Sequence, residues 1–184
     1  MTYSELKIKL DLNHDSRVNI LKNVNTCQLM RYGYLFVDSE DGQCYLFDKN
    51  GNLDDINKVK RIDGYAFSHC KSLTSIKIPD SVTSIGYTAF YDCNSLKSIK
   101  IPNSIKSIGN YAFENCISLT SINIPSSVEW IGHCVFENCT SLKQVVFEGK
   151  TIDQVKAMDN YPWGIKDESI VKCYDAMLSL LTSP

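Results

Sequence analysis

The central part of this chain repeats itself every 23 residues. Four successive units follow the pattern I-G-x-x-A-F-x-x-C-x-S-L-x-x-I-x-I-P-x-S-V-x-S and begin at Ile62, Ile85, Ile108 and Ile131. A fixed period of this length is typical of stacked supersecondary units, each too small to bury its own apolar side chains, so that neighbouring units must cover one another. The period therefore predicts a solenoid.

Within a unit, the pattern predicts strands separated by turns. The stretch L-x-x-I-x-I ends in alternating apolar and polar residues, as a strand with one buried face should, and the first such strand is expected over residues 72 to 78. Pro79 follows, and its missing N–H ends the strand. A second extended piece is expected at residues 82 to 85, and the segment A-F-x-x-C should form a single helical turn with its apolar side chains on one side.

The units resemble the BspA-like leucine-rich repeats, a similarity carried by IGYTAFYDCNSLKSIKIPNSIKS and IGNYAFENCISLTSINIPSSVEW and extending from residue 62 to about 150. The resemblance implies a β-rich, right-handed solenoid of parallel strands with short helical turns, containing four repeats. It also implies a domain used for binding, often in surface proteins that adhere to host or matrix molecules, and no catalytic residue. The buried Asn ladder of longer leucine-rich repeats is absent, and the nearest column holds Ser81, Ser104 and Ser127.

Residues 1 to 61 do not repeat and are expected to form a β-rich N-terminal cap. Residues 6 to 12 alternate as a half-buried strand, and residues 34 to 37 and 44 to 47 should pair as a hairpin around Asp41-Gly42. A second turn is expected at residues 50 to 51. Val59 occupies the column of Val82, so a partial coil precedes the first full repeat. An independent functional domain is the alternative, although so short a segment makes a marginal core by itself.

Residues 151 to 184 are expected to cap the other end of the stack. Thr151 and Gln154 can form a capping box for a short helix, and a last strand is predicted at residues 170 to 173, within the sequence SIVKCYD that resembles the closing strand of such arrays. The apolar side of the helix would consist of Ile152, Val155 and Met158. Between this helix and the last strand, Trp163 either plugs the end of the core, which is the favoured interpretation, or anchors a ligand.

Composition fits one globular core and excludes several partners. The 184 residues are 43% hydrophobic and 22% charged, enough for a sizeable core, and the net charge of −2 gives no reason to invoke nucleic acid. No apolar run approaches the roughly 20 residues of a membrane span. The segment MTYSELKIKLDL carries alternating lysines where a signal peptide needs a continuous apolar stretch, so the chain as written is expected to be cytoplasmic unless a leader has been removed.

Four of the eight cysteines occupy a single repeat column, namely Cys70, Cys93, Cys116 and Cys139. In that column they are expected to be buried, unpaired core residues, because disulfides between adjacent coils would distort a regular stack. The other four have no spacing pattern. No C-x-x-C occurs, so neither a metal site nor a cofactor is expected, and the simplest prediction is a reduced protein.

The polar positions of the predicted strands form the candidate binding surface. Lysines recur on them, Val146 shares this exposed register, and no acidic residue is expected on the strands. Such a face suits an acidic protein or a sulfated glycan, although exposed lysines also serve solubility and discourage edge pairing. Trp130 replaces the serines of its column and either packs against the cap or contacts a ligand. The candidate ligand-binding residues are Lys77, Lys97, Lys100, Asn123, Lys143, Gln144, Trp130 and Trp163.

Catalysis is not expected. The histidines, at positions 14, 69 and 133, show no paired carboxylate and no metal-ligand spacing, and adjacent His and Cys residues in a turn point in different directions. The sequence therefore predicts a non-catalytic module that binds a protein or glycan through the strand face. The alternative is an intracellular or particle-borne structural protein held by its terminal caps. Neither the ligand nor the oligomeric state follows from the sequence.

Overall fold

The computed structural model describes residues 24–30, 33–38, 44–47 and 53–174. The strand expected at residues 6 to 12 and the turns expected at 41 to 42 and 50 to 51 lie outside these residues, as does the tail from residue 175. Among the described residues, no helix is long and apolar enough to cross a membrane.

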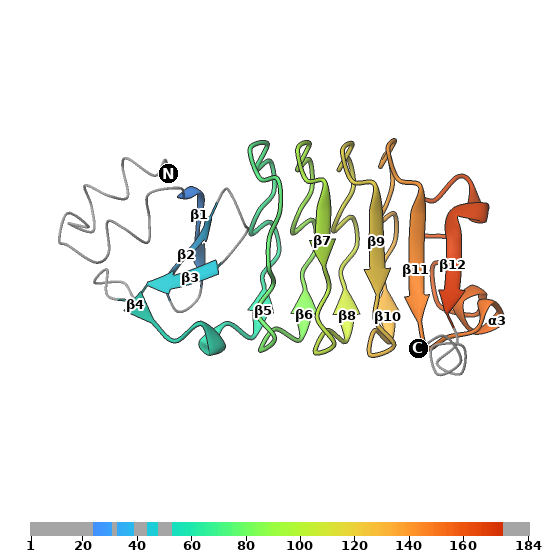
Figure 1. Ribbon diagram of the computed structural model, residues 1–184, viewed down its shortest axis with the longest axis horizontal. Helices are drawn as coiled ribbons and strands as arrows, with labels where there is room; N and C mark the ends of the chain where they lie inside the picture. The colour runs from blue at the N-terminus through green and yellow to red at the C-terminus, as the bar shows by residue number, and fades with distance from the viewer. Residues whose placement is uncertain (1–23, 31–32, 39–43, 48–52, 175–184) are drawn as a thin grey trace, which may run out of the picture.

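The repeats stack as a parallel solenoid, which confirms the predicted fold (Figure 1). One sheet has the order β10-β8-β6-β5, and the other has the order β12-β11-β9-β7. Strands one coil apart pair in parallel and in register, so that Ile85 lies opposite Ile108. The strands of the first sheet are β5 (Arg61–Ile62), β6 (Ser84–Ile85), β8 (Ser107–Ile108) and β10 (Trp130–Ile131). Those of the second are β7 (Ser98–Lys100), β9 (Ser121–Ile124), β11 (Gln144–Glu148) and β12 (Val171–Tyr174).

The strands of the second sheet are shorter than the sequence pattern predicts. In the first repeat, the strand expected over residues 72 to 78 is reduced to a single bridge between Lys77 and Lys100. The leucines that open the L-x-x-I-x-I stretch belong to the preceding turn, because the N–H of Leu73 bonds to the oxygen of Cys70 and that of Leu96 to the oxygen of Cys93. These N–H groups therefore cannot also form the hydrogen bonds of a parallel β-ladder between coils.

A stack of phenylalanine rings runs through the core. Consecutive rings are nearly parallel, with centroids 5.2 Å apart between Phe67 and Phe90, 5.3 Å between Phe90 and Phe113, and 6.1 Å between Phe113 and Phe136. All four are buried. Fully burying a side chain of this size contributes roughly 1.5–3 kcal/mol, so the column is a principal source of stability between coils.

The segment expected to be a helical turn consists instead of two successive turns. Its hydrogen bonds join residues three apart, as from Ala66 to Asp63 and from Cys70 to Phe67. In the first coil Tyr65 and His69 have positive φ angles of 62° and 60°, and the equivalent residues of later coils repeat this. A left-handed residue every fourth position interrupts a helix. The turns leave alternate N–H groups directed at the next coil, as in the bond from Phe67 to Ala89.

The glycine column of the repeat is required by close backbone approach between coils. A Cβ at Gly109 would lie 2.6 Å from the carbonyl carbon of Gly86, and one at Gly86 would lie 2.5 Å from the nitrogen of Gly64. Real Cβ atoms do not approach backbone this closely. Glycine therefore sets the spacing at which each coil rests on the previous one.

An antiparallel sheet precedes the solenoid, in the order β1-β2-β3-β4. Strands β2 (Gly33–Asp38) and β3 (Cys44–Phe47) pair as the predicted hairpin, and Leu35 and Leu46, which face each other, are fully buried. Strand β1 covers Val24–Met30 and β4 covers Leu53–Asp54. The 3-10 helix η1 (Ile56–Lys58) leads to Val59, which is buried in the column predicted for the partial coil.

The C-terminal segment closes the stack with a short helix and a last strand. Helix α3 (Ile152–Lys156) begins with the predicted capping box of Thr151 and Gln154, and buries Val155. After the 3-10 helix η2 (Glu168–Ile170), strand β12 adds to β11 in parallel. Ile152, expected on the packed side of the helix, is instead 41% exposed.

Candidate binding surface

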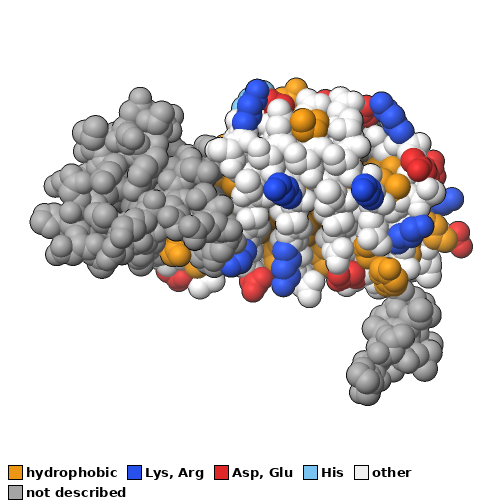
Figure 2. Space-filling model, turned by 45° about the horizontal axis from the view of Figure 1, so that its top comes forward, with side chains coloured by type: hydrophobic (Ala, Val, Ile, Leu, Met, Phe, Trp, Pro, Cys, Tyr) orange, Lys and Arg blue, Asp and Glu red, His pale blue; other side chains and the backbone are white. Residues whose placement is uncertain are grey.

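The exposed side of the second sheet carries the lysines predicted to bind a ligand. We call this the lysine face, defined by Lys77, Lys97, Lys100 and Lys143. All four side chains are exposed, whereas the isoleucines between them, such as Ile99, point into the core. In Figure 2 the basic side chains stand apart on a mostly uncharged surface, with acidic side chains toward its margins.

The register of the solenoid places these lysines in two rows. Lys77 and Lys100 occupy one row and are direct neighbours, since an isolated parallel bridge joins them. Lys97 and Lys143 occupy another, separated by Thr120, whose N–H bonds to Lys97 and whose oxygen accepts from Lys143. Adjacent coils lie about 4.8 Å apart, so the backbone positions of Lys77 and Lys100 are about one such spacing apart, and those of Lys97 and Lys143 about two.

Lys77 and Lys100 also line a hollow of about 370 Å³ at the N-terminal end of the face. Pro79, Pro102, Asp80 and Asn57 of η1 also line it. Side chains of like charge on neighbouring strands repel one another. An anionic group bound between the two lysines would relieve that repulsion.

Two features of this face differ from the sequence-based expectation. Val146 is buried, with 5% exposure, because its neighbours on the same face are Asn123 of β9 and Lys172 of β12, which flank it on both sides. The sheet also contains an acid, since β11 extends to Glu148. The amide of Asn123 donates to the Glu148 carboxylate at 3.4 Å. Asn123 and Gln144 therefore lie on the face, but at its more neutral C-terminal part.

The two candidate tryptophans lie apart from the lysine face. Trp130 is 38% exposed and belongs to β10 in the other sheet, beside Ser107 of β8. Trp163 is 1% exposed, its ring centroid is 5.3 Å from that of Phe147, and its indole N–H donates to the oxygen of Asp159 at 2.8 Å. Trp163 therefore packs at the end of the core, in agreement with the favoured interpretation, and its side chain is not presented at the surface.

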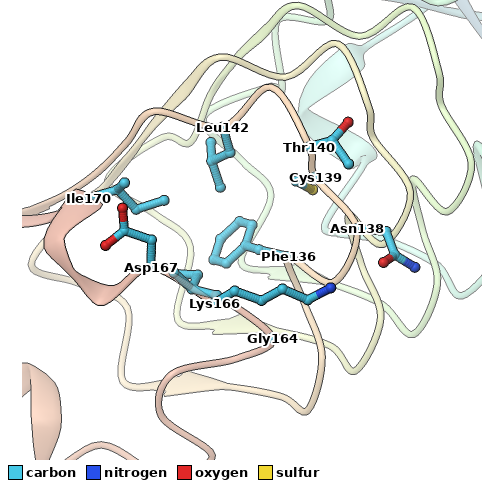
Figure 3. A pocket seen from close by; sticks show the side chains of 10 residues that line it. Phe136, Asn138, Cys139, Thr140, Leu142, Gly164, Lys166, Asp167 and Ile170 are labelled. Atoms are coloured by element: carbon cyan, nitrogen blue, oxygen red, sulfur yellow. The ribbon is translucent and has the colours of Figure 1, made fainter.

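A smaller pocket, of about 250 Å³, lies where the last coil meets the C-terminal segment (Figure 3). The side chains of Phe136, Leu142 and Ile170 converge there, with those of Lys166 and Asp167 beside them. The pocket adjoins the last ring of the phenylalanine stack, where the ring spacing is widest. We interpret it as looser packing at the end of the core.

A group of tyrosines on the turn side of the solenoid does not stand out in the sequence. Four of them line a hollow of about 540 Å³, which we call the tyrosine hollow: Tyr65, Tyr87, Tyr91 and Tyr111. Tyr65 and Tyr111 share one repeat column, whereas the other two come from different columns. Inspection of single columns therefore does not bring the four together. The available signal was the presence of an aromatic residue near the same turn in three successive units.

A carboxylate pairs with one of the histidines, contrary to expectation. His69 Nδ1 lies 2.9 Å from Asp92 Oδ2, and Lys71 Nζ lies 3.6 Å from the same oxygen. The hydrogen bond with His69, aided by the charge of Lys71, lowers the pKa of Asp92. The partners are 23 positions apart, so the pair forms only when one coil lies on the next.

The thiol beside this pair belongs to the core. Cys70, next to His69 in the sequence, packs against the hydrophobic cluster but is half-buried, not fully buried as predicted for its column. Within the described residues, no group of three or more His, Cys, Asp or Glu side chains comes close enough to hold a metal ion. We therefore interpret the His69–Asp92 pair as a contact between coils.

Comparison with known proteins agrees with the solenoid. The family described as BspA type leucine-rich repeat region matches residues 43–159 in six copies, two more than the four units apparent from the strict repeat pattern. No curated protein matches the chain.

Two solved structures illustrate the similarity. A leucine-rich repeat protein from Bacteroides ovatus is 35% identical, with a TM-score of 0.55 over 63% of this chain and 28% of its own. The T. pallidum leucine-rich repeat protein is 32% identical, with a TM-score of 0.50 over 68% of this chain and 58% of its own. The matched region thus spans less than two thirds of either relative.

Proposed function

Because this chain belongs to the BspA-type leucine-rich repeat family, we propose that it is a non-catalytic binding module that engages an acidic surface of a protein partner through the lysine face. The repeat family suggests a module of protein-binding or adhesion type, and solenoids of this class are typically non-enzymatic. Repeats of this kind offer a continuous, rigid surface for recognition.

The observation that carries the proposal is the arrangement of charge on the lysine face. Within the described part of the chain, Lys97, Lys100 and Lys143 form no ion pair within 4.0 Å. Two other lysines of the solenoid do have such partners, namely Lys71 in Asp92 and Lys106 in Glu129. Three basic side chains without acidic partners raise the local positive potential and favour association with an acidic surface.

The rigidity of the sheet supports the same conclusion. The backbone at Lys97 and Lys100 is hydrogen-bonded to the neighbouring coils, and the side chain of Ile99, which lies between them, is buried. Their Cα positions are therefore fixed before binding, which reduces the entropy lost when a partner docks. Only the flexible lysine side chains must become ordered.

The test compares two triple variants in a pull-down with the full chain as bait. The variant Lys77→Ser, Lys97→Ser, Lys100→Ser removes three charges from the lysine face, whereas Lys60→Ser, Lys106→Ser, Lys156→Ser removes the same charge elsewhere. Each exposed substitution should change stability by only about 0.5 kcal/mol or less, so both variants should fold. We expect acidic proteins to be retained by the wild type and the control variant, and lost with the lysine-face variant.

Salt and competition refine the result. Binding should weaken as ionic strength rises, because exposed charges are screened over about 8 Å at physiological salt. Retention of all partners by the lysine-face variant would contradict the proposal. Binding to a heparin oligosaccharide with the same dependence on the three lysines, but to no acidic protein, would instead indicate a sulfated glycan as the ligand.

A further inference from the structure

The tyrosine hollow lies on the turn side of the solenoid and presents aromatic surface to solvent. Tyr65 is 63% exposed and Tyr87 is 45% exposed, while Tyr91 and Tyr111 are half-buried. Polar groups line the same hollow, namely Ser68, His69, Thr88 and Glu114. Large aromatic side chains left open beside convergent polar groups are characteristic of recognition sites.

The rings form walls rather than a platform. The ring centroids of Tyr65 and Tyr87 are 5.3 Å apart with planes at 72°, and those of Tyr87 and Tyr111 are 5.7 Å apart with planes at 88°. Perpendicular neighbours stabilise one another edge to face, but they do not provide the flat surface on which consecutive sugar rings stack. They can instead contact a small group from more than one side. The face of each ring carries negative potential and attracts a cation.

The charge of the hollow is also negative. Glu114 lines it and has no basic group within 4.0 Å among the residues that the structure describes. Burial raises the pKa of Glu114, and the nearby carboxylate of Glu137 raises it further. Hydrogen bonding with Tyr65 is the main cause that raises the pKa of Tyr87, and the charges of Tyr111 and Glu114 add to it. Each effect means that the hollow resists additional negative charge.

The basic groups at the margin are already engaged elsewhere. His69 and Lys71 both lie against Asp92, at 2.9 Å and 3.6 Å. Both groups therefore contact Asp92 rather than Glu114, and the carboxylate of Glu114 remains available to a cation from outside the chain.

We propose that the tyrosine hollow is a second binding site, which takes the guanidinium group of an arginine side chain presented by a protein partner. A guanidinium is planar and weakly hydrated, stacks on an aromatic face, and offers paired N–H donors that match a carboxylate such as Glu114. The volume of about 540 Å³ accommodates a side chain that enters from solvent. This site differs from the lysine face in both position and charge, so it does not depend on the function proposed above.

The experiment titrates the full chain with the peptide acetyl-Gly-Arg-Gly-amide and follows the tyrosine ring resonances by NMR. The matched probe contains citrulline, which keeps the shape of arginine but has no charge. We expect the arginine peptide to shift the resonances of Tyr65, Tyr87 and Tyr111 in a saturable way, and the citrulline peptide to bind at least about twofold more weakly.

Two variants and two controls locate the contact. Tyr87→Leu removes the aromatic face but keeps an apolar side chain, and Glu114→Gln removes the charge but keeps the shape. Each should weaken binding of the arginine peptide about two- to fivefold. Tyr174→Leu, at another exposed tyrosine on β12, and the lysine-face triple variant should both bind as the wild type does. Circular dichroism melts establish that each variant is folded.

Three outcomes would overturn the proposal. Equal affinity for the arginine and citrulline peptides would show that charge is not recognised. Saturable binding of cellotetraose at these tyrosines, without binding of the arginine peptide, would make the hollow a glycan site. Absence of binding by any of these probes would show that the hollow is not a site for an isolated arginine side chain.

Discussion

The thiol of Cys116 donates a hydrogen bond to the backbone oxygen of Phe90, which lies 3.2 Å away and 26 positions earlier in the chain. Cys93 makes the same bond to Phe67, and Cys139 to Phe113. The cysteine column thus does more than fill space, because each of these three thiols adds a second hydrogen bond to a carbonyl of the previous coil that already accepts a backbone N–H. A small apolar residue with a weak donor suits such a position.

The first prediction concerns this hydrogen bond. Cys116→Ala should destabilise the protein by about 1 kcal/mol, because it removes one of the two hydrogen bonds that the Phe90 oxygen accepts and leaves the N–H of Cys93 as the other donor. Cys116→Ser, which keeps a donor, should lose less. Chemical denaturation measures both, with Cys134→Ala, outside the core cluster, as the control. If the Ser variant is less stable than the Ala variant, the position requires apolar volume rather than a donor.

The second prediction concerns thiol reactivity. Burial raises the pKa of the Cys93 and Cys116 thiols strongly, and raises that of Cys139 to about 12. Since the thiolate is the reactive form, native protein at about pH 8 should leave these three unmodified by iodoacetamide. Denaturation without a reductant should make all three react, as shown by intact mass and peptide mapping. Persistent protection after denaturation would indicate disulfides.

Repetition explains how much of this structure could be predicted from the sequence. Columns of identical residues mark positions that have the same structural role in every coil, so the parallel register and buried positions such as Phe113 were predictable. Features that join different columns of different coils were not. Tyr87 gathers beside Tyr65 from another column, along turns that positive φ angles direct. His69 and Asp92 do share a column, but they are different residue types there, so inspection of the column does not reveal their pairing.

The end of the array limited prediction for another reason. Val146 occupies a column that is polar in the earlier coils, yet it is buried because β12 extends the sheet beyond it. Trp163 belongs to no column, and only its place next to Phe147 shows that it closes the core. The serine column shows the same effect of context, since Ser81 and Ser127 donate to the preceding coil, whereas Ser104 meets no hydrogen-bond partner among the residues that the structure describes.

The third prediction concerns the spacing of coils. Gly109→Ala should destabilise by about 3 kcal/mol or more, because the new methyl group would overlap backbone atoms of Gly86 and Tyr87 that cannot move away without separating the coils. Gly64→Ala is the matched control, since its Cβ would lie 3.3 Å from the nearest atom, the oxygen of Tyr87. Thermal denaturation of both variants tests this. Similar melting temperatures would mean that the coils adjust to a methyl group.

The fourth prediction compares two rings of the phenylalanine stack. Phe113 has a ring on either side, whereas Phe136 has one ring neighbour in the stack and adjoins the pocket at the end of the core. Phe113→Ala should therefore cost about 3–5 kcal/mol, and Phe136→Ala measurably less, in denaturant titrations. Equal losses would indicate that the C-terminal segment packs as tightly as a full coil.

The last prediction concerns acid stability. The pKa of Asp92 is lowered in the folded protein, mainly by its hydrogen bond with His69. A carboxyl group with a lowered folded pKa adds stability above its unfolded pKa of about 3.9, and this contribution is lost as pH falls through the folded value. Asp92→Asn should therefore be less stable than the wild type near neutral pH, and the difference in melting temperature should shrink below about pH 4. Asp80→Asn, at an exposed carboxyl, is the control. A difference that stays constant down to about pH 2 would mean that Asp92 acts through packing rather than through its charge.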